Sequence, residues 1–301
     1  MSSHSSVPTA RSFLPDRVRI LIIGKANAGK TTILKKICSD TDVPIVRDGH
    51  GNIIDIPESM NPTIARGLHD IDHEITYPSR SGLVFHDTRG LEAGPASEID
   101  AILGFIEQRA RMEEKDALHV IWYCVSCDDD RPLGPVELQF FSKDKEGVPV
   151  IMVFTKYDAI EAKAYGDLRR MGCTRQAARR EMPELAERMF QKYFMSRVNV
   201  MPYAPRAHAR FKDLDKGHSN CAELTRQTIT ALDKHKHLQE LFILASKYEL
   251  ESRLMSVIYK MDILPSKTEM ARSLLTWFPH MWAMVRSNMH VARSHCCFVI
   301  E

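Results

Sequence analysis

The sequence predicts an α/β fold, in which a mostly parallel, six-stranded sheet carries helices on both faces. Three observations predict it: short runs rich in branched apolar residues, apolar residues at helical spacing between several of them, and glycine-containing turns where runs end. The six runs span residues 17–23, 71–77, 82–86, 118–125, 148–154 and 197–203. A chain of 301 residues with 44% hydrophobic residues can bury a sizeable core, which suggests one α/β domain with an appendage.

The first run leads directly into a glycine-rich loop. Residues 24–31 read G-K-A-N-A-G-K-T, the pattern of a phosphate-binding loop, and apolar residues at helical spacing follow. Glycines let the backbone turn its amides toward phosphate, and the helix N-terminus adds positive potential. Lys30 would reach the β- and γ-phosphates, and the Thr31 hydroxyl would ligate Mg²⁺. The candidate phosphate-binding residues are Gly24, Asn27, Ala28, Gly29, Lys30, Thr31 and Thr32. The alternative is a glycine turn that binds nothing.

A second motif, D-T-R-G at residues 87–90, follows the run 82–86. Asp87 would hold Mg²⁺ through water, and the Gly90 amide can approach the γ-phosphate because glycine carries no side chain. Taken alone, this motif is also an ordinary turn.

A third motif, T-K-Y-D at residues 155–158, follows the run 148–154. A carboxylate at Asp158 can accept hydrogen bonds from the guanine N1–H and exocyclic amine, a donor pair that adenine lacks. Lys156 would lay its stem across the base, and Thr155 completes the candidate base-binding set. The alternative is a polar loop at a strand end.

The three motifs, in this order, resemble the G domain of the Ras-like P-loop GTPases, with T-K-x-D in place of N-K-x-D. The resemblance covers roughly residues 17–235 and implies a P-loop NTPase fold, with GTP or GDP as ligand and Mg²⁺ as cofactor. It also implies that Thr63, in the N-P-T-I of residues 61–64, binds Mg²⁺ and senses the γ-phosphate; a proline turn is the alternative. The family's S-A-K motif is not recognisable after the run 197–203, so that base contact is unassigned.

Leu91 stands where many family members have a glutamine that orients the attacking water. The resemblance therefore shifts toward the Era, TrmE and septin relatives, and Asn27 is similar to the Era/TrmE loop pattern. In such relatives that asparagine helps to place K⁺, so K⁺ is a second candidate cofactor; the alternative is that Asn27 only suits a tight loop. The resemblance makes Lys30, Asn27 and Thr63 the candidate catalytic residues, and Thr31, Thr63 and Asp87 the candidate metal ligands. Relatives of this kind often dimerise across the nucleotide face, so a homodimer and an effector protein are expected partners.

The domain organisation follows the motifs. Residues 1–16 are rich in Ser and Pro and are expected to form a disordered lead-in. The G domain is expected to span residues 17–236, with a closing helix over 222–236. Residues 237–301 are expected to form a C-terminal helical extension. Two apolar runs, 43–46 and 53–56, flank a Gly-rich turn and predict an extra hairpin. In the extension, tryptophans at 277 and 282 complete a core or dock peripherally on a membrane.

Composition sets the remaining bounds. A net charge of +2 gives no reason to expect a nucleic-acid partner, and seven cysteines without a secretory leader indicate an intracellular, cytoplasmic protein. Cys124 and Cys127 are expected to be buried thiols. The acidic residues 128–130 are expected to form a solvated loop, with an accessory cation site as the alternative.

These observations favour a slow, Mg²⁺-dependent GTPase that acts as a switch. The first alternative is a guanine-nucleotide-binding module without significant hydrolysis that acts as an interaction scaffold, which Leu91 makes credible. A scaffold that has lost nucleotide binding is opposed by the intact Lys30, Thr31, Asp87 and Asp158. An ATP-specific relative is opposed by Asp158.

Overall fold

The computed structural model of the protein describes residues 17–38, 43–54, 70–88, 90–91, 96–129, 133–214, 216 and 221–246. Thr63 and the rest of the predicted switch segment 61–64 lie outside these residues, as do the lead-in 1–16 and the tryptophan-containing part of the C-terminal extension.

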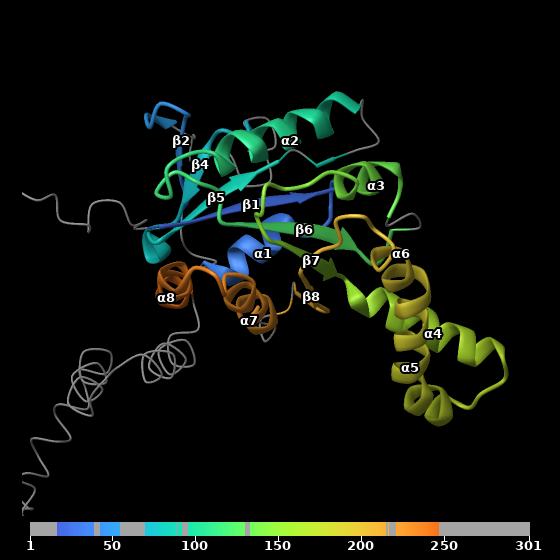
Figure 1. The fold of residues 1–301 in the computed structure, drawn as a ribbon. Coiled ribbons are helices and arrows are strands. Elements are labelled where there is room, and N and C mark those ends of the chain that lie inside the picture. The colour runs from blue at the N-terminus through green and yellow to red at the C-terminus, as the bar shows by residue number, and fades with distance from the viewer. Residues whose placement is uncertain are drawn as a thin grey trace, which may run out of the picture. The chain divides into compact units, whose positions relative to one another are not determined.

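Within the described residues, eight strands form one mixed, mostly parallel sheet in the order β3-β2-β4-β5-β1-β6-β7-β8 (Figure 1). The strands are β1 (Val18–Gly24), β2 (Ile45–Arg47), β3 (Ile53–Ile54), β4 (Glu74–Thr76), β5 (Leu83–Asp87), β6 (Val120–Ser126), β7 (Val150–Thr155) and β8 (Ala207–Arg210). Strands β5, β1, β6, β7 and β8 run parallel to one another, and β4 joins β5 antiparallel. The predicted α/β class and mostly parallel sheet are confirmed.

The prediction of six strands is wrong, because the predicted hairpin adds two strands to the sheet. Strands β2 and β3 pair antiparallel, and β2 also pairs with β4. The hairpin turn is held by the Asp48 carboxylate, which accepts hydrogen bonds from the backbone N–H groups of His50 at 2.9 Å and Asn52 at 2.8 Å. The hairpin therefore extends the edge of the sheet instead of standing apart from it.

The strand predicted over residues 197–203 is also wrong. A short helix, α6 (Ser196–Val198), begins this stretch, and the strand at this edge is β8, with Ala207 opposite Ile151 of β7. Val198 and Met201, three residues apart, are buried, whereas Val200 is 77% exposed. This is helical spacing, so the apolar residues that suggested a strand fill one side of a helical turn.

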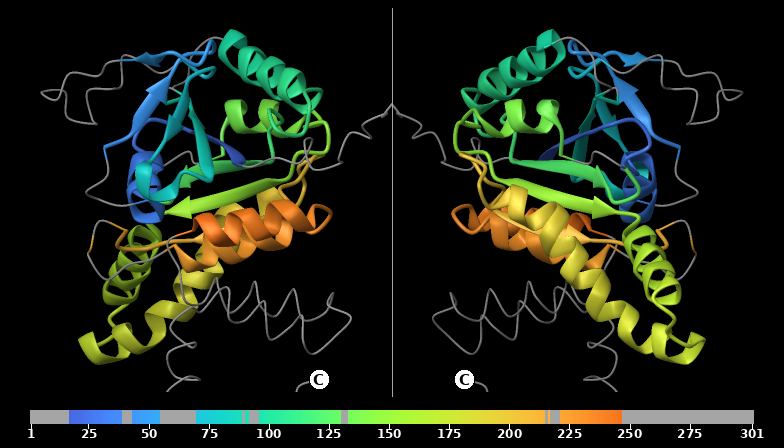
Figure 2. Two further views of the ribbon diagram at one scale, coloured as in Figure 1. Left: turned by 90° about the vertical axis from the view of Figure 1, so that its left-hand side faces the viewer. Right: turned by 90° about the vertical axis from the view of Figure 1, so that its right-hand side faces the viewer.

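Helices cover both faces of the sheet (Figures 1 and 2). They are α1 (Lys30–Ile37), α2 (Ala96–Ala110), α3 (Pro135–Phe141), α4 (Tyr157–Arg170), α5 (Arg175–Phe190), α7 (Ala222–Ala231) and α8 (Lys236–Ala245). Along β6, Ile121 and Tyr123 pack into the apolar cluster shared with α2 and α3. The intervening Trp122 faces the opposite layer, where its ring contacts Phe242 of α8. Alternation along a buried strand thus builds a core on each face.

The boundary predicted at residue 236 falls at the start of α8, and the compact unit continues to Lys247. Phe242 of α8 is fully buried and packs edge-on against Trp122, with 6.3 Å between ring centroids. Trp122 Nε1 also donates a hydrogen bond of 3.1 Å to the Thr228 hydroxyl of α7. The closing helix predicted over 222–236 ends at Ala231 as α7, and a separate helix, α8, begins at Lys236 and packs on the same sheet.

None of the helices that the structure describes is long and apolar enough to span a membrane.

Candidate functional site

The glycine-rich loop connects β1 to α1 and folds around the ammonium group of Lys30. Lys30 Nζ donates hydrogen bonds to the carbonyl oxygens of Gly24 at 2.8 Å and Lys25 at 3.0 Å, and the residue is 8% exposed. Asn27 and Gly29 adopt left-handed backbone conformations, with φ values of 61° and 81°. The loop therefore closes on a buried cation, which is the charge that a phosphate group would meet.

Gly90 brings the D-T-R-G motif into contact with this loop. A Cβ atom built on Gly90 would lie 2.4 Å from the backbone nitrogen of Ala26, so only glycine allows this approach. The next residue, Leu91, donates its backbone N–H to the Gly24 carbonyl at 3.2 Å. The Leu91 side chain is 2% exposed and belongs to the apolar core, so it offers no polar group to the site.

Asp87, at the end of β5, interacts electrostatically with Lys30. Burial raises the pKa of Asp87 to about 6, although the charge of Lys30 acts in the opposite direction. Burial likewise lowers the pKa of Lys30 against the attraction of Asp87. For both groups, loss of hydration outweighs their mutual attraction, so a bound cation beside Asp87 and a bound anion beside Lys30 would each stabilise a charge.

Thr31, a predicted metal ligand, lies in the first turn of α1 and is exposed, and Thr32 follows it half-buried. Thr63, the third predicted metal ligand, lies outside the described residues.

The T-K-Y-D motif is tied to the glycine-rich loop through its first residue. The Thr155 hydroxyl donates a hydrogen bond of 3.1 Å to the Ala28 carbonyl, across 127 positions of sequence. Lys156 has a left-handed backbone (φ 53°), and α4 begins immediately after it. Asp158 therefore lies in the first turn of α4, three residues after the threonine that bonds to the glycine-rich loop. The Thr155 side chain is 1% exposed, so this hydrogen bond satisfies a buried hydroxyl.

Sequence reasoning missed the loop that follows β8. The backbone N–H of Asp213 donates to Asp158 Oδ1 at 3.2 Å, and the backbone N–H of Tyr157 donates to the Phe211 carbonyl at 2.8 Å. Asp213 has a left-handed backbone (φ 52°). Residues 211–214 therefore lie against the first turn of α4, next to Asp158. The strand predicted over 197–203 had pointed to a different loop, so no residue of 211–214 was among the candidates. The strand that leads there, A-H-A-R, has little β-forming character, so no local signal distinguished it.

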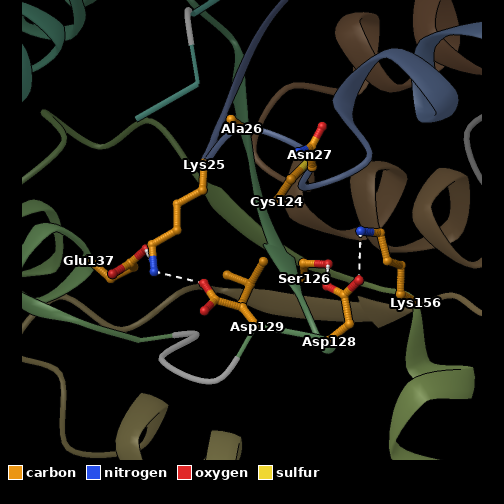
Figure 3. A pocket seen from close by; sticks show the side chains of 10 residues that line it. Lys25, Ala26, Asn27, Cys124, Ser126, Asp128, Asp129, Glu137 and Lys156 are labelled. Carbon is orange, nitrogen blue, oxygen red and sulfur yellow. Dashed lines mark hydrogen bonds and ion pairs between the residues drawn. The ribbon is translucent and has the colours of Figure 1, made fainter. Parts of the chain in front are cut away.

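A pocket opens beside the glycine-rich loop and is bounded by charged side chains (Figure 3). Its lining residues are Lys25, Ala26, Asn27, Cys124, Val125, Ser126, Asp128, Asp129, Glu137 and Lys156. Asn27 is exposed here, whereas Ala28 is 1% exposed. Asp128 is exposed and Asp129 is half-buried, which agrees with the expected solvated loop, and both also pair with lysines that line the pocket.

The two cysteines of the C-x-x-C pair are buried thiols, as predicted. Cys124 and Cys127 are 1% and 8% exposed, and burial raises the pKa of each to about 12. In the part of the chain that the structure describes, no group of three or more His, Cys, Asp or Glu side chains could hold a metal ion by itself.

Comparison with known proteins finds a family match over part of the chain. Residues 19–156 match the family model described as 50S ribosome-binding GTPase. No curated protein matches the chain. Among solved structures, it is similar to a mutant of S. thermophilus NFeoB bound to GDP, at 12% sequence identity and a TM-score of 0.36, over 89% of this chain and 91% of that one. The matched stretch is less than half of the chain; it carries the glycine-rich loop, the D-T-R-G motif and the first two residues of the T-K-Y-D motif, and over it the chain is similar to this GTPase family.

Proposed function

We propose that this protein is a molecular switch that binds GTP and GDP and hydrolyses GTP slowly with Mg²⁺. The observation that carries the proposal is the meeting of three loops at the carboxyl ends of β1, β5 and β7. Lys30 lies in the first loop, Gly90 packs on it from the second, and Thr155 bonds to it from the third. This is the edge of a parallel sheet at which ligands bind in α/β proteins.

Each side chain then has a defined role. The amides and glycines of the first loop, with Lys30, hold the phosphates. Asp158 recognises guanine, Lys156 lies along its plane, and the backbone of Asp213 lines the opposite side. The residues assigned to phosphate and base are Gly24, Asn27, Ala28, Gly29, Lys30, Thr31, Thr32, Gly90, Thr155, Lys156 and Asp158.

The oxygen donors beside Lys30 suit Mg²⁺. A carboxylate at Asp87 and a hydroxyl at Thr31 are the hard ligands that this ion takes, and Thr63 would complete the set. When bound, Mg²⁺ would neutralise charge on the phosphates.

Slow turnover is expected because Leu91 is buried and apolar and cannot orient a water molecule. A rate at or below about 10⁻² s⁻¹ is typical of unassisted GTPases. The Era, TrmE and septin relatives share this lack of glutamine. The same observation favours the second candidate, a guanine-nucleotide-binding scaffold without significant hydrolysis. A single-turnover hydrolysis measurement separates the two.

An effector protein and a homodimer across the nucleotide face are the partners that we propose for the switch.

Guanine selectivity tests the proposal directly. Fluorescent GTP, GDP and ATP would be titrated against the wild type, Asp158→Asn and the control Asp167→Asn, which makes the same change farther along α4. We expect guanine-selective binding by the wild type and the control, and at least about tenfold weaker guanine binding by Asp158→Asn, because the amide cannot accept from both guanine donors. Equal binding of ATP and GTP by the wild type would contradict it.

The contribution of Mg²⁺ is expected to depend on pH through Asp87. Its pKa is about 6, so below pH 6 the carboxyl is neutral and no longer attracts the cation. The gain in GDP affinity on adding Mg²⁺ should therefore fall about tenfold between pH 8 and pH 5. Asp87→Asn is the control, since any pH dependence that remains in it belongs to the nucleotide. An identical pH profile in both proteins would exclude Asp87 as the ligand.

K⁺ is proposed to support hydrolysis from a position beside Asn27. GTP turnover should be faster in K⁺ than in Na⁺ at equal ionic strength, because a fixed cation stabilises charge in the transition state. Asn27→Gly keeps the left-handed backbone but deletes the side-chain oxygen, and it should abolish the difference. Equal rates of the wild type in the two salts would rule out this role.

A further inference from the structure

The turn after β6 carries two consecutive carboxylates that hold lysines from two different loops. Asp128 Oδ2 lies 2.8 Å from Lys156 Nζ, and Asp129 Oδ2 lies 2.9 Å from Lys25 Nζ (Figure 3). Lys25 belongs to the glycine-rich loop and Lys156 to the T-K-Y-D motif. One turn therefore contacts both of the elements assigned to the two ends of a nucleotide.

The turn is hydrogen-bonded to Thr155, the last residue of β7 and the first of the T-K-Y-D motif. The backbone N–H of Cys127 donates a hydrogen bond of 2.9 Å to the Thr155 carbonyl, and the hydroxyl of Ser126 donates to the Asp128 carboxylate. Burial acts to raise the pKa of Asp128, but the hydrogen bonds from Lys156 and Ser126 prevail and leave it lowered. Asp128 is thus an ionised group at a set position beside Lys156.

Lys25 has a second acidic neighbour besides Asp129. Glu137 Oε1 lies 3.6 Å from Lys25 Nζ, and the Glu137 side chain is 2% exposed. Glu137 is itself held by the backbone N–H of Gly134 at 2.7 Å, at the N-terminus of α3. Removal of the Asp129 charge would therefore leave Lys25 beside a carboxylate, whereas removal of the Asp128 charge would delete the ion pair that it makes with Lys156.

We propose that Asp128 is a positioning residue for nucleotide binding, which orients the ammonium of Lys156 so that its stem lies along the base. This inference rests on the proposed function, because it assigns Asp128 a role only in a protein that binds a guanine nucleotide.

The physical reason is the competition for the Lys156 ammonium. A lysine side chain has four rotatable bonds, and its charge is attracted to the phosphates of a nearby nucleotide. Asp128 holds the ammonium at the side of the pocket, which leaves the methylene stem free to cover the base. Without Asp128, ordering of that stem would have to be supplied when the nucleotide binds.

The direction in which Asp128→Asn changes nucleotide affinity distinguishes a positioning role from a simple effect of charge. Removal of any carboxylate near a polyanion reduces repulsion, so charge alone predicts tighter nucleotide binding. Loss of positioning predicts the opposite. Asp128→Asn and Asp129→Asn make the same change at adjacent residues, so their comparison isolates the pairing with Lys156.

The experiment measures the affinity of full-length protein for a fluorescent GDP analogue, with thermal melting as a check of folding. The variants are Asp128→Asn, Asp129→Asn, Lys156→Met and the Asp128→Asn/Lys156→Met double variant. Methionine keeps an apolar stem and removes the ammonium. We expect Asp128→Asn to weaken binding about fivefold, the size typical of a half-exposed ion pair. Asp129→Asn should bind at least as tightly as the wild type.

The double variant tests whether Asp128 acts through Lys156. If it does, Asp128→Asn causes no further loss in the Lys156→Met background. Additive losses, or equal losses in Asp128→Asn and Asp129→Asn, would overturn the inference while leaving the proposed function intact. A wild type that binds no guanine nucleotide would overturn both.

Discussion

Replacement of Lys30 by alanine is expected to weaken GTP and GDP binding by about 30-fold to several thousand-fold, the range for loss of one partner of a buried charge pair. Lys30 is 8% exposed and its pKa is lowered by burial, so the folded protein has already removed much of the water from this ammonium. A phosphate would add a second negative charge near Lys30, besides that of Asp87. Alanine removes that attraction and leaves the loop carbonyls of Gly24 and Lys25 without their donor.

The matched control is Lys35→Ala, which lies in the same helix α1 and is exposed. It changes the net charge equally and should bind nucleotide as the wild type does, apart from a small long-range effect that salt screens. Equilibrium titration at two salt concentrations checks both variants. Equal losses in Lys30→Ala and Lys35→Ala would mean that Lys30 acts only as part of the general field.

Replacement of Gly24 by alanine should lower the free energy of unfolding by about 3 kcal/mol or more, because the new methyl group meets backbone. A Cβ atom at Gly24 would lie 2.4 Å from the Cys124 carbonyl oxygen and 3.0 Å from the Cys124 Cβ. Gly24 ends β1, and Cys124 lies opposite it in the neighbouring strand β6. These two central strands would have to separate where the glycine-rich loop begins. Urea unfolding without nucleotide measures this loss independently of binding.

Gly104→Ala is the control for that experiment. Gly104 lies inside α2, and none of the described residues comes within 4 Å of the position that a Cβ atom would take there. Alanine at this site should raise the free energy of unfolding by about 0.5–1 kcal/mol, because glycine in a helix interior loses more backbone entropy on folding. A stable Gly24→Ala variant would show that the strands adjust more readily than their hydrogen-bonded register suggests.

Much of the candidate site could be predicted because its chemistry is local. Residues 24–31 contain the glycines, the lysine and the hydroxyl in one uninterrupted stretch, and the strand before them and helix after them have clear apolar spacing. The hairpin of β2 and β3 was equally local. Its pairing with the rest of the sheet was not, and the predicted six strands became eight when β2 paired with β4.

Prediction failed where the deciding contacts were distant in sequence. Residues 197–203 are apolar enough for a strand, yet they form a helical turn that buries the side chains of Val198 and Met201. Strand β8 has weak local preference and exists because β7 offers it an edge to pair with. The boundary at 236 stays a prediction, but a distant contact bears on it, since Phe242 of α8 packs on Trp122 of the central strand β6.

The sequence by itself determined the class of fold, and it supplied the predictions of a phosphate-binding loop and of a guanine-selecting carboxylate, because each motif is a few consecutive residues beside a strand. Tertiary structure alone decided that Asp158 meets the loop 211–214, that Thr155 bonds to Ala28, and that Lys25 and Lys156 share one acidic turn. The pairing of Lys25 with Asp129 spans 104 positions of sequence. Such contacts follow from the order of strands in the sheet, which no local pattern of residues specifies.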